Sequence, residues 1–467
     1  MNLPNMQDAR VRNKTKVEYI YQDNIINKDL FKEKKYYIKT YGCQMNVHDS
    51  EEIKAMLENL GFIGTEVMNE ADIIILNTCA VRENAHDKVF GFLGRCKHLK
   101  KFKKDLIIGL CGCMAQEEAV VEEIKSKHPY IDIVFGTHNL NSLPSLLIEK
   151  SKKLNIEVYS KEGNVFENIQ YKRDSHITAW VNIMFGCDKF CTYCIVPYTR
   201  GKQRSRKSEE IIKEVQSLKE DGYKEITLLG QNVNAYGKDL EGEINFAELL
   251  KRVSDIGIER IRFVTSHPWD FTDEMIDIIA ERNNIMPYIH LPIQSGSSRI
   301  LKLMGRRYTK EEYLSLVEKI KEKIKNCAIT TDIIVGFPNE SDEDFLETLD
   351  VVQNVKYDGA FTFIYSPREG TPAAKMEDSI PLEVKEDRLK KLNDIVNKYA
   401  LINNKKLEDT IVKVLVLGKS EKDEMKVYGY TETMKLVNIV GSENLIGKII
   451  DVKIVEAKSF SLDGIAL

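Results

Sequence analysis

The sequence predicts an α/β chain in three parts: a doubly wound parallel sheet, then a partial (β/α)6 barrel, then a small β-barrel. Two series of β-branched strands alternate with amphipathic helices, a pattern that is typical of parallel sheets covered by helices. After about residue 403 the helical period stops, and short strands separated by glycine and polar turns follow. The length of 467 residues also indicates more than one hydrophobic core.

The first β/α series follows a polar leader, residues 1–33, which we expect to be loosely ordered. Expected strands cover 36–40, 72–77, 106–110 and 131–135, and expected helices cover 48–60, a stretch from about 84, and 117–127. Together they predict a domain over 34–152. The polar stretch 153–172 shows no clear period, and we interpret it as a linker.

The second series predicts a central domain over 173–403. Its expected strands are 178–184, 224–229, 260–264, 287–291, 328–334 and 359–364. The expected helices are 208–220, 245–255, 272–282, 310–323, 341–355 and 384–403. In such barrels the chemistry lies at the C-terminal ends of the strands. Residues 404–467 form the expected small barrel, with strands at 411–417, 435–440 and 449–455.

Composition narrows the functional classes. The 68 basic and 72 acidic residues give a net charge of -4, so overall charge offers no argument for a nucleic-acid-binding protein. The sequence shows no secretory signal, and apolar runs such as 73–76 are too short to cross a bilayer. We therefore expect a cytoplasmic protein that does not contact a membrane. Nine cysteines in a reducing compartment favour metal binding or catalysis over disulfides.

The strongest local signal is the cysteine cluster Cys187, Cys191 and Cys194, which directly follows the first strand of the second series. Three thiolates in one tight loop are able to bind three corners of an iron-sulfur cubane, which leaves the fourth iron open to a small molecule. A structural zinc ion needs a fourth ligand. The nearest upstream histidine, His176, lies at the opposite end of the strand, so the pattern favours the iron-sulfur cluster.

A second set of cysteines follows three successive strands of the first series. Cys43, Cys79 and Cys113 come at the C-terminal ends of these strands, which meet at one edge of a parallel sheet. They therefore form a second potential three-thiolate site. The alternative is that they are small buried hydrophobic residues, which is how we interpret Cys96, Cys111 and Cys327.

The spacing of Cys187, Cys191 and Cys194 at a barrel mouth resembles the radical S-adenosylmethionine (SAM) superfamily. With the second cysteine set and the C-terminal β-domain, residues 34–467 resemble the methylthiotransferases. This resemblance implies a radical SAM domain, an N-terminal domain with an auxiliary cluster, and a C-terminal TRAM domain implicated in RNA binding. The implied cofactors are two 4Fe-4S clusters and S-adenosyl-L-methionine. The implied ligands are Cys187, Cys191 and Cys194 for the cluster that cleaves SAM, and Cys43, Cys79 and Cys113 for the auxiliary cluster.

Loops after other strands of the central domain supply the predicted SAM contacts. These are Gly230, Gln231 and Asn232 after the second strand, Gln294 and Ser295 after the fourth, and Gly336 and Glu340 after the fifth. Tyr193, inside the cysteine motif, either packs near the adenine of SAM or only packs its own loop. Glycine and polar residues are ordinary in loops, so it is their shared place at the barrel mouth that favours a binding role.

Segments 191–201, 230–237 and 365–372 resemble the branch of the family that modifies tRNA. That branch converts N(6)-(dimethylallyl)adenosine, next to the anticodon, to its 2-methylthio derivative. The resemblance implies two SAM molecules per turnover, the tRNA anticodon stem-loop as substrate, a flavodoxin- or ferredoxin-type reductant protein and a sulfur donor. We expect a monomer.

Three alternatives remain open at this stage. Related methylthiotransferases act on threonylcarbamoyl-adenosine in tRNA or on an aspartate of a ribosomal protein. A third alternative, from another class, is a non-catalytic iron-sulfur RNA-binding sensor.

The predicted RNA contacts form a basic run directly after the central cysteines. It comprises Arg200, Lys202, Arg204, Arg206 and Lys207. These side chains would neutralise phosphates near the active site, although a solvated turn explains the charges equally well. A second basic run over 97–104 is typical of a solvated helix face.

Overall fold

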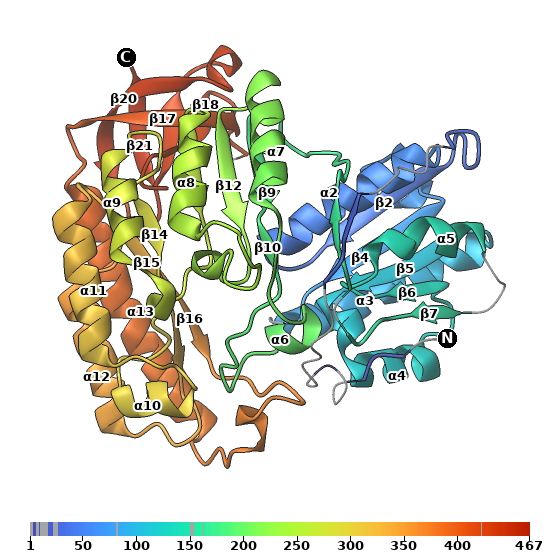
Figure 1. Cartoon of the computed structure of the whole chain (residues 1–467), viewed down its shortest axis with the longest axis horizontal. Helices are drawn as coiled ribbons and strands as arrows, with labels where there is room; N and C mark the ends of the chain where they lie inside the picture. The colour runs from blue at the N-terminus through green and yellow to red at the C-terminus, as the bar shows by residue number, and fades with distance from the viewer. Residues whose placement is uncertain are drawn as a thin grey trace.

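The computed structural model describes residues 3–5, 9, 17–21, 27–80, 83–149, 154–161, 163–421 and 423–467. Two α/β domains lie side by side, and a small β-barrel packs against the second of them (Figure 1). The predicted fold class, with its three kinds of sheet, is therefore confirmed. Among the described residues, no helix has the length and apolar character needed to span a membrane.

The N-terminal domain is a six-stranded parallel sheet in the order β3-β2-β4-β5-β6-β7. The strands are β2 (Lys35–Thr40), β3 (Ile63–Gly64), β4 (Ile73–Thr78), β5 (Ile107–Gly112), β6 (Ile133–Phe135) and β7 (Asn155–Glu157). The helices are α2 (Gln44–Asn59), α3 (Glu83–Phe102), α4 (Glu118–Lys127) and α5 (Leu143–Ile148). One face of β4 packs against α3 and α4, and the other against α2 and α5, as a doubly wound sheet requires.

Short strands occupy stretches that the sequence analysis left without structure. The expected linker 153–172 contains β7, which extends the sheet, and β8 (Val165–Glu167). Strand β8 pairs in parallel with β1 (Tyr19–Tyr21) from the leader. Three-residue strands are too short to show a period, which is why the sequence did not reveal them. Leader residues 1–2, 6–8, 10–16 and 22–26 lie outside the described part of the chain.

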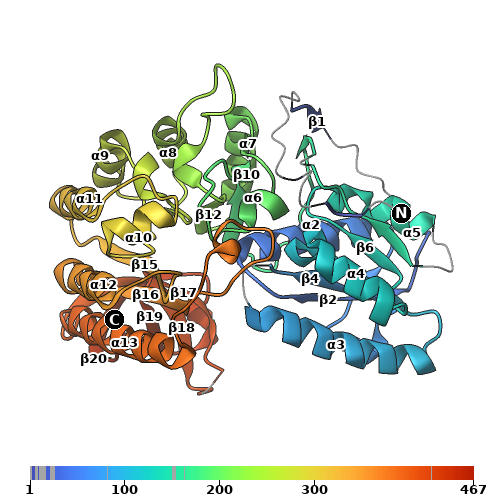
Figure 2. The ribbon, with the colours of Figure 1, turned by 90° about the horizontal axis from the view of Figure 1, so that it is seen from below.

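The central domain is the expected partial barrel of six parallel strands. Its strands are β9 (Thr178–Asn182), β12 (Glu225–Leu229), β13 (Arg260–Phe263), β14 (Tyr288–His290), β15 (Ala328–Val335) and β16 (Gly359–Ile364). An isolated parallel bridge between Ile261 and Ile285 connects the two three-stranded halves. The outer helices are α7 (Ser208–Glu220), α8 (Phe246–Asp255), α9 (Asp273–Glu281), α11 (Lys310–Lys323), α12 (Asp342–Val355) and α13 (Leu382–Lys405). Figure 2 shows these helices surrounding the strands.

Alternating burial identifies the inner face of this barrel. On β15, Ile329 and Ile333 are buried in the core beneath the helices, whereas Asp332 between them is only half-buried. On β16, the Thr362 hydroxyl donates a hydrogen bond to Asn393 of α13 at 2.6 Å, so α13 covers the face of β16 that carries Thr362. Side chains on a strand alternate between faces, so Phe361 and Phe363, which are 59% and 46% exposed, belong to the inner face.

The C-terminal domain is a closed five-stranded barrel in the order β17-β18-β19-β21-β20. Its strands are β17 (Ile411–Lys419), β18 (Lys426–Thr431), β19 (Leu436–Val440), β20 (Ile449–Ala457) and β21 (Leu462–Ala466). The prediction missed β18 and β21. Arg260, at the start of β13, donates to the carbonyl oxygens of Lys413 and Tyr430. The small barrel therefore contacts the N-terminal ends of the central strands, opposite the mouth.

Candidate functional site

The loop of Cys187, Cys191 and Cys194 follows β10 (Met184–Phe185), a short strand that pairs antiparallel with β11 (Arg204–Ser205). The Cys187 amide donates to the Gly201 carbonyl at 3.1 Å. At Gly186, with φ of +68°, a Cβ atom would lie 2.0 Å from the Lys202 carbonyl oxygen, so only glycine allows the chain to pass here. The far side of the loop is held by Thr192, whose amide donates to Met304 at 2.9 Å.

Burial and one cation set the electrostatics of these thiols. Burial raises the pKa of the Cys187 thiol to about 12, and it also raises the pKa of the Cys194 thiol. The buried guanidinium of Arg306 donates to the Cys191 sulfur at 3.7 Å, and to the carbonyl oxygen of Pro292 at 2.5 Å. Sequence reasoning missed Arg306, because no motif spacing connects it with the cysteines.

Three thiols on one loop fit an iron-sulfur cluster, in which three of the irons take a thiolate each. In the described part of the chain, no three His, Cys, Asp or Glu side chains gather closely enough to hold one metal ion. In a cubane each thiolate binds a different iron, so the three sulfurs lie farther apart. The thiols whose pKa is raised by burial would release their protons to solvent and would hold the iron as thiolates.

The second set of cysteines gathers at the C-terminal edge of the N-terminal sheet. Cys43 precedes α2, Cys79 follows β4, and Cys113 follows β5. A Cβ atom on Gly42 would lie 2.8 Å from the Cys79 Cβ, so the first two segments touch. Burial raises the pKa of Cys113 to about 12; Arg200 opposes this effect, and the thiols of Cys79 and Cys43 add to it. The three cysteines therefore lie at one edge of the sheet, on segments that follow neighbouring strands.

Arg200 connects this second set with the central domain. Its guanidinium donates to Asp49 on α2 at 2.5 Å, and to the Asn46 side-chain oxygen at 3.3 Å. The Cys43 thiol donates to that same Asn46 oxygen at 3.4 Å. An apolar contact of Cys113 with Ile195 and Tyr198 lies alongside. The segment directly after Cys194 thus packs on the second cysteine set.

The predicted RNA-binding run needs correction at its three arginines. Arg200, Arg204 and Arg206 are buried: Arg206 pairs with Glu167 and Glu214, and Arg204 donates to the carbonyl oxygen of Gly163. The contacts with Glu167 and Gly163 join the central domain to the segment before it, whereas Glu214 lies on α7 of the same domain. These charges are therefore used within the fold and do not face phosphates. Lys202 and Lys207 are half-buried.

The predicted SAM contacts divide into two groups. Within the described residues, the side-chain oxygens of Gln231 and Asn232 are buried without a hydrogen-bond partner, and so is the Oε2 atom of Glu340. Asn232 is oriented by its amide, which donates to Asp270 at 2.8 Å. Gly230 is held tightly, because a Cβ atom there would lie 2.5 Å from Met184 Cγ.

The other predicted contacts are engaged within the fold. Glu340 pairs with Arg388 of α13 at 2.7 Å and accepts the Gly336 amide, so it anchors the loop after β15. The Ser295 hydroxyl lies 3.5 Å from that of Thr348. The backbone of Gln294 bonds to β15 at Asp332 and Ile334. Tyr193 packs against the apolar cluster that includes Met304 and Phe337.

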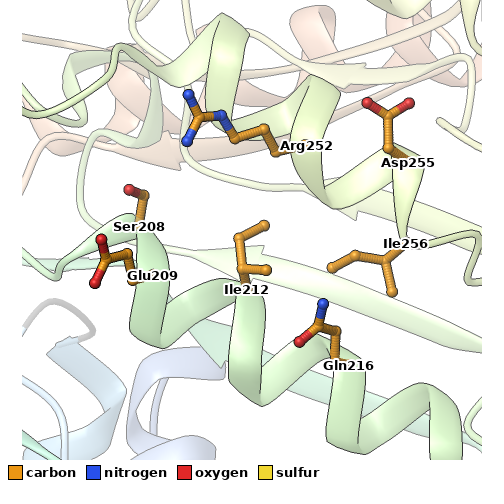
Figure 3. Close-up of a pocket in the computed structure, with 7 residues that line it drawn as sticks. All are labelled: Ser208, Glu209, Ile212, Gln216, Arg252, Asp255 and Ile256. Carbon is orange, nitrogen blue, oxygen red and sulfur yellow. The ribbon is translucent and has the colours of Figure 1, made fainter.

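The surface pockets of the described residues include two on the central domain. The larger, about 390 Å³, lies between α7 and α8 in the helical layer and includes Ile212, Arg252 and Asp255 (Figure 3). None of its lining residues belongs to a cysteine set or to a predicted SAM loop. The smaller, about 170 Å³, opens beside the Cys187 loop between Lys189 and Lys238.

Three family models match the chain. Residues 181–352 match the radical SAM superfamily, residues 35–136 match the uncharacterized protein family UPF0004, and residues 405–467 match the TRAM domain. The tRNA-2-methylthio-N(6)-dimethylallyladenosine synthases of Staphylococcus epidermidis and Staphylococcus aureus are 54% identical to this chain over 466 residues, which is 99% of this chain and 91% of theirs. The chain belongs to this synthase family. The resemblance to the methylthiotransferases is thereby confirmed.

The two cysteine sets of this synthase family member fall in different matched regions. Cys43, Cys79 and Cys113 lie in the UPF0004 match, and the Cys187 loop lies in the radical SAM match. Among solved structures, the radical S-adenosylmethionine methyltransferase TsrM from Kitasatospora setae, with cobalamin and a [4Fe-4S] cluster bound, is similar in fold. It is 14% identical, with a TM-score of 0.53 over 73% of this chain and 77% of that one.

Proposed function

We propose that this protein transfers a methylthio group to carbon 2 of N(6)-(dimethylallyl)adenosine, next to the anticodon of tRNA, and consumes two SAM molecules per turnover. The observation that carries this proposal is the contact of the segment after the radical cysteines with the second cysteine set and with α2. Residues directly after Cys194 pack against Cys113, and Arg200 reaches Asp49 on α2. Methylthio transfer requires a radical centre and a sulfur-carrying centre that act on the same base. Two cysteine sets held next to each other by these contacts suit such a reaction.

Each cysteine set has a separate task in this proposal. Cys187, Cys191 and Cys194 hold the cluster that binds SAM, and Arg306 places a buried positive charge beside Cys191. Cys43, Cys79 and Cys113 hold an auxiliary cluster that carries the sulfur. When bound, SAM and the radical cluster supply a 5′-deoxyadenosyl radical, which is able to remove the inert hydrogen from the adenine ring.

The inner face of the barrel supports dimethylallyl-adenosine over threonylcarbamoyl-adenosine as the substrate. Phe361 and Phe363 leave large apolar surfaces exposed on this face. Phe363 lies beside Ile334 in the strand register, and Ile334 packs in the cluster that includes Tyr193 of the radical loop. This apolar surface suits the branched apolar dimethylallyl group, whereas the carboxylate of a threonylcarbamoyl group would require polar partners.

The partners proposed with this activity are the tRNA anticodon stem-loop, a flavodoxin- or ferredoxin-type reductant protein and a sulfur donor, and the protein acts as a monomer. The target base has to leave the stack of the anticodon loop to reach the barrel mouth. The small C-terminal barrel, which matches the TRAM domain, supports an RNA substrate.

A direct test uses the anaerobically reconstituted protein with SAM, dithionite and a synthetic anticodon stem-loop that carries dimethylallyl-adenosine. We expect 5′-deoxyadenosine and a methylthiolated nucleoside in the mass spectrum. A threonylcarbamoyl stem-loop should remain unmodified. If the protein binds RNA but forms no 5′-deoxyadenosine, the sensor alternative replaces the enzyme.

A further inference from the structure

Trp269 is exposed in an unusual setting. It lies in the 3-10 turn Pro268–Asp270, which follows β13 at the mouth of the barrel, and it is 43% exposed. Two cations face its ring: the Lys189 Nζ lies 5.2 Å and the Arg307 Cζ 5.3 Å from the ring centroid. A large aromatic ring that is partly open to solvent beside two cations offers a surface on which a base is able to stack.

This surface adjoins the radical cysteines. Lys189 and Phe190 lie between Cys187 and Cys191, and the Phe190 ring is 45% exposed. Arg307 is exposed and follows Arg306, which donates to the Cys191 sulfur. A base delivered to the radical loop therefore passes close to the Trp269 ring.

Three cations, those of Lys189, Lys238 and Arg307, and three carboxylates lie at this rim. Lys189 and the exposed Lys238 share a single buried carboxylate, that of Asp270, at 3.0 and 2.7 Å. The neighbouring Asp188 and Asp239 carboxylates accept hydrogen bonds from the Gln203 backbone amide and side chain, respectively. Of the three cations, Arg307 is exposed and lies over the Trp269 ring.

We propose that Trp269 and Phe190, with Lys189, Lys238 and Arg307, form a platform for the unpaired nucleotides of an RNA loop. A nucleotide next to the target base stacks on Trp269, and the cations contact the adjoining phosphates. Aromatic rings interleaved with cations are the usual means of binding single-stranded RNA. This platform takes over the role first expected of the basic run 200–207, whose arginines are buried, and it rests on the proposed RNA substrate.

The chain contains two tryptophans, Trp180 and Trp269, which makes a specific optical test possible. The variant Trp180→Phe retains Trp269 as its one tryptophan. We expect the tryptophan fluorescence of this variant to fall as anticodon stem-loop RNA is added to the reconstituted protein. The RNA concentration at half of the fluorescence change should equal the concentration at half of the anisotropy change of labelled RNA. In the matched variant Trp269→Phe, the remaining Trp180 should change little.

The affinity of variants for the anticodon stem-loop is the second test of this platform. Trp269→Ala should weaken stem-loop binding by about tenfold, as loss of one stacked base does. Arg307→Ala should reduce the slope of log Kd against log salt by about one, because one phosphate contact is lost. The control Phe102→Ala removes a more exposed ring at the end of α3 and should leave affinity unchanged.

The outcomes separate this inference from the proposed function. If wild-type protein binds the stem-loop while Trp269 fluorescence and the affinity of Trp269→Ala stay unchanged, the platform is wrong and the proposed function stands. If wild-type protein does not bind the stem-loop at all, the RNA substrate fails, and the platform fails with it.

Discussion

The guanidinium of Arg200 donates to the carboxylate of Asp49 at 2.5 Å, and both side chains are buried between the N-terminal and central domains. Arg200 follows the radical cysteines closely in the chain, and Asp49 lies on α2, the helix that Cys43 precedes. This ion pair therefore fixes the two cysteine sets relative to each other.

Removal of this pair should uncouple the two sites. Arg200→Ala leaves the Asp49 carboxylate buried without its partner, a change that typically costs about 3–5 kcal/mol of stability. We expect a lower denaturant midpoint, together with SAM cleavage that continues while methylthio transfer is lost.

The control is Lys127→Ala, which removes an exposed pair with Glu123 on α4 and should cost about 1 kcal/mol or less. Equal denaturant midpoints for the two variants would show that the Arg200 pair does not hold the domains together.

The two cysteine sets should have different mutant phenotypes. Cys194→Ala should abolish both 5′-deoxyadenosine and product, because the radical cluster loses a ligand. Cys113→Ala should retain cleavage and lose methylthio transfer, and each variant should bind less iron. Cys327→Ala, a half-buried cysteine outside both sets, is the control. Equal loss of cleavage in Cys194→Ala and Cys113→Ala would argue against separate tasks.

Arg306 should set the reduction potential of the radical cluster. A charge-assisted hydrogen bond to a ligand sulfur favours the reduced state, so Arg306→Gln should make reduction harder. We expect about a tenfold shift in the reduction equilibrium, which corresponds to about 59 mV for one electron.

A redox titration followed by electron paramagnetic resonance measures this shift. Arg306→Lys should recover part of it, and Arg307→Gln, at the exposed neighbouring position, should leave the potential unchanged. If Arg306→Gln and the wild-type protein have the same reduction potential, Arg306 does not tune the cluster and serves only in packing.

The phenylalanines on the inner face should select the prenylated base. Phe361→Ala and Phe363→Ala should each lower the preference for dimethylallyl-adenosine over unmodified adenosine by about tenfold, because apolar contacts to the side chain are lost. Competition between the two stem-loops, read by mass spectrometry, measures that preference. Leu346→Ala, an equally exposed apolar residue on α12, is the control. An unchanged preference in both phenylalanine variants would place the prenyl group elsewhere.

The sequence predicted the regular parts of the fold well. Helices α7 and α11 have the predicted bounds, since their amphipathic period is clear and Thr309 with Glu312 forms a capping box at the start of α11. Strands β1, β7 and β8 were missed because three residues show no period. Strand β18 contains Gly429 and β21 contains Gly464, which obscured both.

The site was predictable only where spacing or strand order carried the information. The six cysteines lie where the strand order predicts, at strand ends. The arginine run was misjudged because the partners of Arg206, Glu167 and Glu214, come from other segments, and local charge does not reveal them. Arg306 and Trp269 belong to no motif, so only the structure brings them next to the radical loop.

Nucleoside mass spectrometry of tRNA from cells that lack this protein tests the central claim most directly. The proposed function predicts that the 2-methylthio derivative of N(6)-(dimethylallyl)adenosine disappears, that its dimethylallyl precursor accumulates, and that the wild-type gene restores the product while a Cys194→Ala gene does not. Persistence of the 2-methylthio derivative at its normal level would contradict the assignment of this substrate.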